Sequence, residues 1–276
     1  MRRLPVLLLC TALASFPADS RAAEAQGYFR IGTARLDVSH AIAVIEDASV
    51  GGDDDNTMVF LSAAPLDAAR VAASFDPMDG VREQEPADGY IRLCITPDGD
   101  DCGLFFSPEG FNSGGYGELK LDRRDAQRIA GHFVLEKPED FMGKDYQFDL
   151  RFDTAVTPPS GSALSEGGGD PGRAYSAYLA ALAKGDLAAL RGMAGDEGAW
   201  RYPEDDATAA KEALKSARDG QPVQAEILRG RLNGDQAILW VRGVDRDDIP
   251  RAGRVLMRKV DGRWRFEEGD LESVEE

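Results

Sequence analysis

The stretch TPPSGSALSEGGGDPG, residues 157–172, divides this chain into two parts. Proline, glycine and serine at this density favour an extended connection over a packed helix or strand. The sequence before the stretch is rich in short β-like segments, whereas the sequence after it begins with helical patterns. We therefore predict two domains, at residues 26–156 and 172–276, joined by a linker at 157–171. A chain of 276 residues is long enough to give each domain its own hydrophobic core.

The first domain is predicted to be mainly antiparallel β, as a sandwich or a curled sheet. In the segment 146–152, for example, apolar residues alternate with polar ones, which is typical of a strand with one buried face. Many short strands separated by turn residues favour this architecture. The candidate strands are 28–34, 37–45, 57–61, 89–96, 102–106, 117–121, 128–135 and 146–152.

The second domain begins with amphipathic helices. Tyr175, Tyr178, Leu179 and Leu182 follow the i, i+3, i+4, i+7 spacing of one helix face, and we expect Asp170 to cap this helix. Further helices are expected at 187–193 and 207–218, followed by strands at 223–231, 236–241, 254–260 and 263–268. Asn233-Gly234 and Asp261-Gly262 have the chemistry of tight hairpin turns. Helices followed by an antiparallel meander indicate an α+β domain.

Two resemblances accompany these patterns. The segment AALAKGDL at 180–187 and DGRW at 261–264 resemble the nuclear-transport-factor-two-like (SnoaL-like) superfamily over about the last hundred residues. This resemblance implies a cone whose sheet wraps around a helix and encloses a pocket, in isomerases, cyclases, dehydratases or exported binding and accessory modules. The runs SHAIA at 39–43, VFLS at 59–62 and PLD at 65–67 loosely resemble exported bacterial β domains of unassigned function.

No catalytic constellation is recognised. The enzymes of that superfamily use Asp and His in the pocket, but the second domain contains no histidine, since His40 and His132 both lie in the first. The candidate pocket-lining side chains are Tyr175, Tyr178, Trp200 and Trp240, although core packing is the favoured interpretation of all four.

Acidic clusters raise the question of calcium. Asp53 and Asp55, in the run DDDN at 53–56, have suitable oxygen atoms. Met58 and Ala64 stand where an EF-hand loop counted from Asp53 needs glycine and glutamate. A solvated loop is therefore the favoured interpretation, and we expect no metal or other cofactor.

The first 25 residues predict export. Arg2 and Arg3 precede the apolar stretch 4–16, and small residues allow cleavage after Ala22 or Ala25. The apolar stretch is too short to span a bilayer, so no membrane insertion is expected once this leader is removed. In an oxidising compartment Cys94 and Cys102 are expected to pair across a hairpin, and the closed loop would stabilise the fold by about 2.5 kcal/mol.

Charge limits the possible partners. The net charge is −17, which disfavours nucleic acid and anionic membranes. Residues 26–171 hold 12 basic and 27 acidic residues. A cationic strip near the C-terminus is predicted either to face solvent or to dock on this acidic domain. It comprises Arg251, Arg254, Arg258, Lys259, Arg263 and Arg265.

Together these features predict an exported, periplasmic or secreted protein that binds a protein or small molecule without catalysis. One alternative is a small-molecule-binding protein or an isomerase- or dehydratase-like enzyme using the cone of the second domain. Another is an inhibitor or immunity-like protein that binds a basic partner through the acidic domain.

Overall fold

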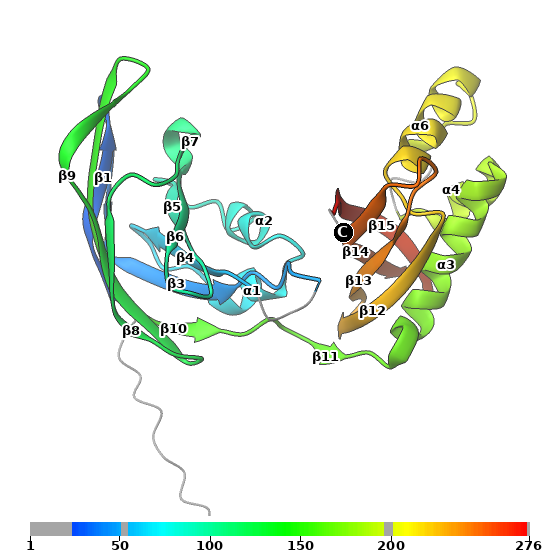
Figure 1. Ribbon diagram of the computed structural model, residues 1–276, viewed down its shortest axis with the longest axis horizontal. Helices are drawn as coiled ribbons and strands as arrows, with labels where there is room; N and C mark the ends of the chain where they lie inside the picture. The colour runs from blue at the N-terminus through cyan, green and yellow to red at the C-terminus, as the bar shows by residue number, and fades with distance from the viewer. Residues whose placement is uncertain (1–23, 51–54, 196–200, 275–276) are drawn as a thin grey trace, which may run out of the picture.

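Two separate β-sheets organise the chain (Figure 1). The computed structural model describes residues 24–50, 55–195 and 201–274. Residues 24–157 form an N-terminal unit around a ten-stranded mixed sheet, and residues 162–274 form a C-terminal unit around a five-stranded antiparallel sheet. Of the predicted leader, residues 1–23 lie outside the described residues, and Glu24 and Ala25 begin strand β1.

The sheet of the N-terminal unit has the order β2-β1-β10-β3-β4-β5-β6-β7, with β9 paired to β10 and β8 to β9. Its pairs are antiparallel except for a short parallel contact between β10 and β3. The strands are β1 (Glu24–Ile31), β2 (Ala34–Val38), β3 (His40–Ile45), β4 (Thr57–Ser62), β5 (Tyr90–Ile95), β6 (Asp101–Phe106), β7 (Phe111–Ser113), β8 (Glu118–Arg124), β9 (Arg128–Phe141) and β10 (Lys144–Thr157).

The two ends of this sheet bend toward each other around one apolar core. Phe29 of β1 stacks on Phe106 of β6 with ring centroids 4.4 Å apart, although four strands separate β1 from β6 in the sheet. Phe148 of β10 also stacks on Phe29, with ring centroids 5.7 Å apart. The opposite face of β3–β5 is covered by the short helices α1 (Ala68–Ala73) and α2 (Pro77–Arg82), which bury Val71 and Val81.

The predicted disulfide between Cys94 and Cys102 is present. Cys94 of β5 is opposite Gly103, and the next residue, Ile95, is opposite Asp101, so Cys102 is the extra residue of a β-bulge. A bulge changes the direction of the side chain that it carries. The bulge therefore explains how Cys102 reaches Cys94 without being its register partner.

The C-terminal unit places helices on one face of its sheet, in the order β11-β12-β13-β14-β15. The helices are α3 (Gly169–Lys184), α4 (Leu187–Met193) and α6 (Ala207–Asp219). The strands are β11 (Ser162–Ala163), β12 (Gln224–Asn233), β13 (Gln236–Val244), β14 (Pro250–Val260) and β15 (Arg263–Ser273), and the 3₁₀ segments are η1 (Ser107–Glu109) and η2 (Glu166–Gly168).

Three local details differ from the sequence-based expectations. Part of the predicted linker is regular structure, because β11 pairs with β12 and η2 leads into α3. Asp170 lies inside the first turn of α3, whose cap position is Gly168 at φ 73°. The turn after β12 uses Gly234 and Asp235, since Asn233 still pairs with Gln236. The Asp261-Gly262 turn has positive φ at both residues, as expected.

Contacts between the two units centre on Asp47, which is only 8% exposed. Its two carboxylate oxygens bind Arg229 at 2.7 Å and Arg231 at 2.6 Å, both from β12. Arg229 also donates to the carbonyl of Ser49 at 2.6 Å. We call these contacts of Asp47 and Ser49 with the two arginines the Asp47 latch. In Figure 1, α1 and α2 lie between the two sheets.

A second contact lies beside the latch. Arg254 of β14 donates to the backbone carbonyl of Phe75 at 2.9 Å, and its guanidinium lies over the Phe75 ring. Phe75 also packs on a small cluster of Ile238, Trp240 and Leu256. Arg254, a member of the predicted cationic strip, thus contacts the N-terminal unit. Arg251 and Arg265 pair with acids of their own unit.

We predict that Asp47→Asn loosens the contact between the units, because it leaves two partly buried guanidiniums without their carboxylate. Removing one partner of a buried ion pair costs about 3 kcal/mol. Small-angle scattering should show a larger radius of gyration, and proteolysis at 158–161 should accelerate. Asp37→Asn, which removes an exposed partner of Arg35, is the matched control and should change neither. An unchanged scattering profile for Asp47→Asn would contradict the assigned role.

Candidate functional site

The space between α3 and the sheet of the C-terminal unit is occupied by aromatic side chains of the chain itself. Tyr175 and Tyr178 are buried there, and the Tyr178 ring stacks on Phe266 at 4.3 Å. Both hydroxyls have partners: Tyr175 donates to Gln221 at 2.7 Å, and Tyr178 shares a hydrogen bond with Tyr202 at 3.2 Å. Burial raises the pKa of both tyrosines, so they remain neutral. These two candidate pocket residues therefore belong to a packed core.

The other two candidate pocket residues have different outcomes. Trp240 lies on the opposite face of the sheet, in the contact with the N-terminal unit, where the Arg229 guanidinium stacks over its ring at 3.7 Å. Trp200 lies outside the described residues. The structure thus separates Trp240 from Tyr175 and Tyr178 and does not bring the three together around one cavity.

The acidic and histidine candidates also form no catalytic or metal centre among the described residues. Asp53 lies outside them, and Asp55 accepts a hydrogen bond from the Ser49 amide at 2.9 Å. Burial raises the pKa of Asp55. His132 pairs with Asp149 at 2.7 Å across β9 and β10. Within the described ranges, no group of three or more His, Cys, Asp or Glu side chains is placed to hold a metal ion.

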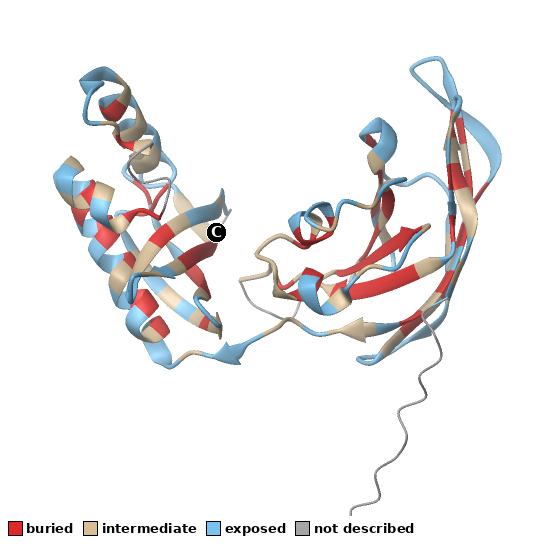
Figure 2. Ribbon diagram, turned by 180° about the vertical axis from the view of Figure 1, so that it is seen from behind, coloured by how far each residue is buried: buried red, intermediate tan, exposed pale blue. Residues whose placement is uncertain are grey.

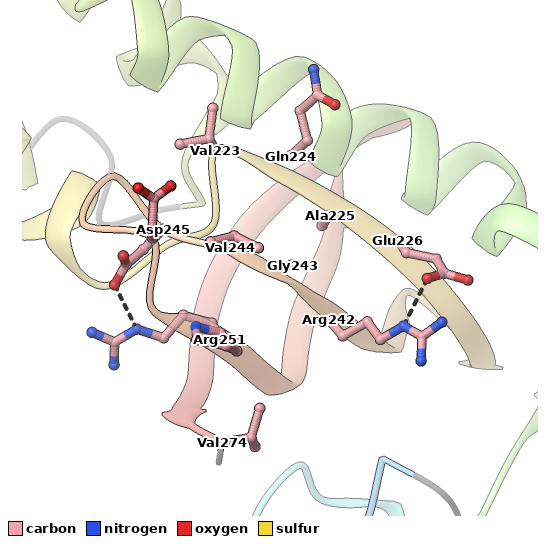
Figure 3. Close-up of a pocket in the computed structure, with 12 residues that line it drawn as sticks. Val223, Gln224, Ala225, Glu226, Arg242, Gly243, Val244, Asp245, Arg251 and Val274 are labelled. Atoms are coloured by element: carbon pink, nitrogen blue, oxygen red, sulfur yellow. Dashed lines mark hydrogen bonds and ion pairs between the residues drawn. The ribbon is translucent and has the colours of Figure 1, made fainter. Parts of the chain in front are cut away.

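An open groove of about 960 Å³ lies at one end of the second sheet (Figure 3). It forms where the first residues of β12, the last residues of β13 and the end of β15 meet. The Val223 amide donates to the Val244 carbonyl at 2.8 Å, and the Val274 amide donates to the Pro250 carbonyl at 3.0 Å. These bonds hold three segments that are distant in sequence around one concave surface.

The groove exposes apolar side chains. Val223, Val244 and Val274 are 47%, 44% and 42% exposed and all line it. Single exposed apolar residues are common on protein surfaces, but several gathered in one concavity mark a binding surface. A second groove, of about 510 Å³, runs between α3 and the start of β12 and shares residues 223–225 with the first. The beginning of β12 is therefore flanked by two concavities.

Four of the five charged side chains that line the groove form two ion pairs, and the fifth is Asp248. Arg242 binds Glu226 at 2.7 Å, and Arg251 binds Asp245 at 2.9 Å, as the dashed lines in Figure 3 show. The twelve described lining residues include no Ser, Thr, Cys, His or Lys. The groove can therefore hold apolar groups beside these two ion pairs, and its residues supply no nucleophile with an adjacent base.

Asp245 organises the loop at the groove's edge. Its Oδ1 accepts the backbone N–H groups of Asp247 and Ile249 at 2.9 and 3.0 Å. The bond from Ile249, together with those from Arg251 and Asp247, lowers the pKa of this carboxyl. A carboxylate that accepts two amides and an arginine is held in its ionised form.

Sequence patterns did not single out the residues of this groove. Val223 counted only as the first residue of a strand, and Val244 and Val274 lay just beyond the predicted strands. Their shared property is that each is an apolar residue at a strand end, which is a common and unspecific signal. The three valines are brought together only by the pairing of β12 with β13 and by the pairing of the end of β15 with the start of β14.

Searches of protein-family models, curated proteins and solved structures found no match to this chain. In the described part of the chain, none of the helices is both long and apolar enough to cross a bilayer.

We predict that Asp245→Asn destabilises the protein at neutral pH and that this effect disappears in acid. The folded-state pKa of Asp245 is lowered, so its contribution is complete above the ordinary aspartate pKa of about 4 and is lost as the pH falls through the folded value. Denaturant unfolding at a series of pH values would measure this. Asp248→Asn, in the same loop, is the control for the loss of one carboxylate. A difference in the free energy of unfolding between wild type and Asp245→Asn that stays constant with pH would refute the assignment.

Proposed function

We propose that this chain is an exported protein that binds an apolar segment of a partner protein in the groove at the start of β12, without catalysing a reaction. The observation that carries this proposal is the gathering of Val223, Val244 and Val274 at an open groove in which both arginines are already paired with carboxylates. Such a surface gains free energy by covering its apolar area, roughly 25 cal/mol for each Å² removed from water.

The packing of the C-terminal unit supports a binding role over an enzymatic one. We propose that this unit is a cone-like member of the nuclear-transport-factor-two-like (SnoaL-like) superfamily, as its sequence resemblance implies. In this chain the space inside the sheet is filled by Tyr175, Tyr178 and Phe266. Among the roles known in that superfamily, an exported binding or accessory module therefore fits better than an isomerase or dehydratase.

A small molecule is the second candidate ligand. The groove volume of about 960 Å³ lies within the range of roughly 300–1,000 Å³ that is typical of small-molecule sites. Its open form favours the protein segment, because sites for small molecules enclose most of the ligand surface.

The groove is tested by the double substitution Val244→Ser/Val274→Ser. A photoreactive residue placed at Val223 should crosslink a partner in an extract of the encoding organism, and the double substitution should abolish the crosslink because it removes the apolar surface. Leu228→Ser, at an exposed position of β12 that does not line the groove, should leave the crosslink intact. A crosslink of equal yield in all three backgrounds would exclude the groove as the site. A crosslinked adduct of small mass would identify the second candidate.

Export is tested separately through the disulfide. Expressed with its first 22 residues, the chain should be shortened in the envelope fraction and have Cys94 and Cys102 blocked to thiol reagents. Expressed from Ala23 with an initiating methionine, it should stay in the cytoplasm with both thiols reactive. Recovery of an uncleaved chain from the cytoplasm in the first case, with Cys94 and Cys102 joined, would contradict export.

A further inference from the structure

The hairpin between β9 and β10 projects from the N-terminal unit as an arm. β8 pairs with β9 only up to Val134, and β1 pairs with β10 only from Tyr146. Residues 136–145 extend beyond both neighbours and pair mainly with each other, apart from a bond from the Gly32 amide to the Asp145 carbonyl. Figure 2 colours this arm as exposed along its whole length, at the upper right.

The tip of the arm is apolar. Met142 is 88% exposed, and its neighbour Phe141 is also exposed. Phe141 rests edge-on against Phe111 at 4.8 Å, and Phe111 in turn contacts Tyr146 at 4.9 Å. Tyr116, also exposed, lies edge-on against Tyr146. Met142 thus lies at the end of a cluster of packed aromatic rings.

The turn at the tip is made by residues that do not favour its backbone conformation. Met142 and Gly143 both have positive φ, at 53° and 80°. This type of two-residue turn is normally made by Asn-Gly or Asp-Gly, because an apolar side chain is strained at positive φ. The equivalent turn at Asp261-Gly262 in the same chain uses the favoured residues. Of the positive-φ residues described other than glycine, Met142 is the only apolar one.

The charges on the arm also oppose its folding. Asp140 of β9 is directly opposite Asp145 of β10, and like charges in that position repel. Glu136 and Glu139 add to the negative charge, Lys137 offsets one of these charges, and Lys144 is already bound to Glu109 at 2.7 Å. Strain, an exposed methionine and opposed carboxylates at one place are typical of a site kept for binding rather than for stability.

We propose that this arm is a docking element that inserts Met142 into an apolar pocket of a second protein whose surrounding surface is basic. The unbranched thioether side chain adapts to pockets of varied shape. The carboxylates behind it give electrostatic complementarity to a basic rim, in keeping with 27 acidic against 12 basic residues in 26–171. This inference does not depend on the groove of the C-terminal unit, because the arm belongs to the other unit.

The test uses two variants that should fold better than the wild type. Met142→Asn creates the favoured Asn-Gly turn, and Asp145→Thr removes the repulsion while leaving the bond from the Gly143 amide to Asp140 intact. We expect both to raise the unfolding midpoint. Asp122→Thr, on an exposed position of β8, is the control for loss of one negative charge elsewhere on the same sheet.

The probe is the total soluble protein of the organism that encodes the chain, passed over the immobilised full-length protein. We expect the wild type and Asp122→Thr to retain a basic protein that is released at about 0.5 M salt. After identification and purification, that protein should bind Met142→Asn and Asp145→Thr about tenfold more weakly than the wild type.

Four results would overturn the proposal. They are retention of no protein, retention of an acidic protein only, equal affinity of all variants for the retained protein, and self-association of the chain that is lost in Met142→Asn. The last would identify a second copy as the occupant of the tip. Because both test variants are expected to be more stable than the wild type, a loss of binding is separated from a loss of folding by the unfolding midpoint.

Discussion

The arrangement of this molecule depends on how the buried carboxylate of Asp47 is neutralised. A carboxylate removed from water needs opposite charge close by, and Asp47 finds it about 180 residues away, in Arg229 and Arg231. Asp55 contributes a second negative charge to the same cluster. The arginines are fixed in turn by Trp240, over which both guanidiniums lie. A carboxylate from one unit and a tryptophan from the other therefore position the same two cations.

The latch also determines which part of the second sheet remains open. Trp240 and Val244 lie four residues apart on β13 and so point to the same face. At the Trp240 end, this face is covered by Phe75 and the latch. At the Val244 end it is uncovered and forms the groove. The part of the groove at Val244 is thus the uncovered continuation of an interface within the chain, whereas Val223 lies beside α3.

The features that could be predicted from sequence were those encoded within a few residues. The apolar stripe of Tyr175, Tyr178, Leu179 and Leu182 indicated α3, and the spacing of Cys94 and Cys102 across a turn indicated the disulfide. The latch and the groove could not be predicted, because Asp47, Arg229 and Val274 meet only through the packing of whole sheets. The arm was missed for a different reason. Its charged residues resemble a loop, so the strand 128–135 was expected to end where β9 continues to Phe141.

The two surfaces proposed for binding belong to different units. Figure 1 shows the arm of β9 and β10 at the side of the N-terminal unit that faces away from the C-terminal unit, and the groove belongs to the C-terminal unit. A flexible connection would let two partners bound at these surfaces move independently. The Asp47 latch instead holds the two units in one orientation and so sets the distance between the surfaces. The pairing of β11 with β12 shortens the irregular part of the linker to residues 158–161, and the Ser160 amide donates to the Ala72 carbonyl at 3.1 Å, which has the same effect. A chain that needed only two tethered binding modules would require neither feature, so the latch and the shortened linker favour a scaffold that presents its partners at a fixed separation.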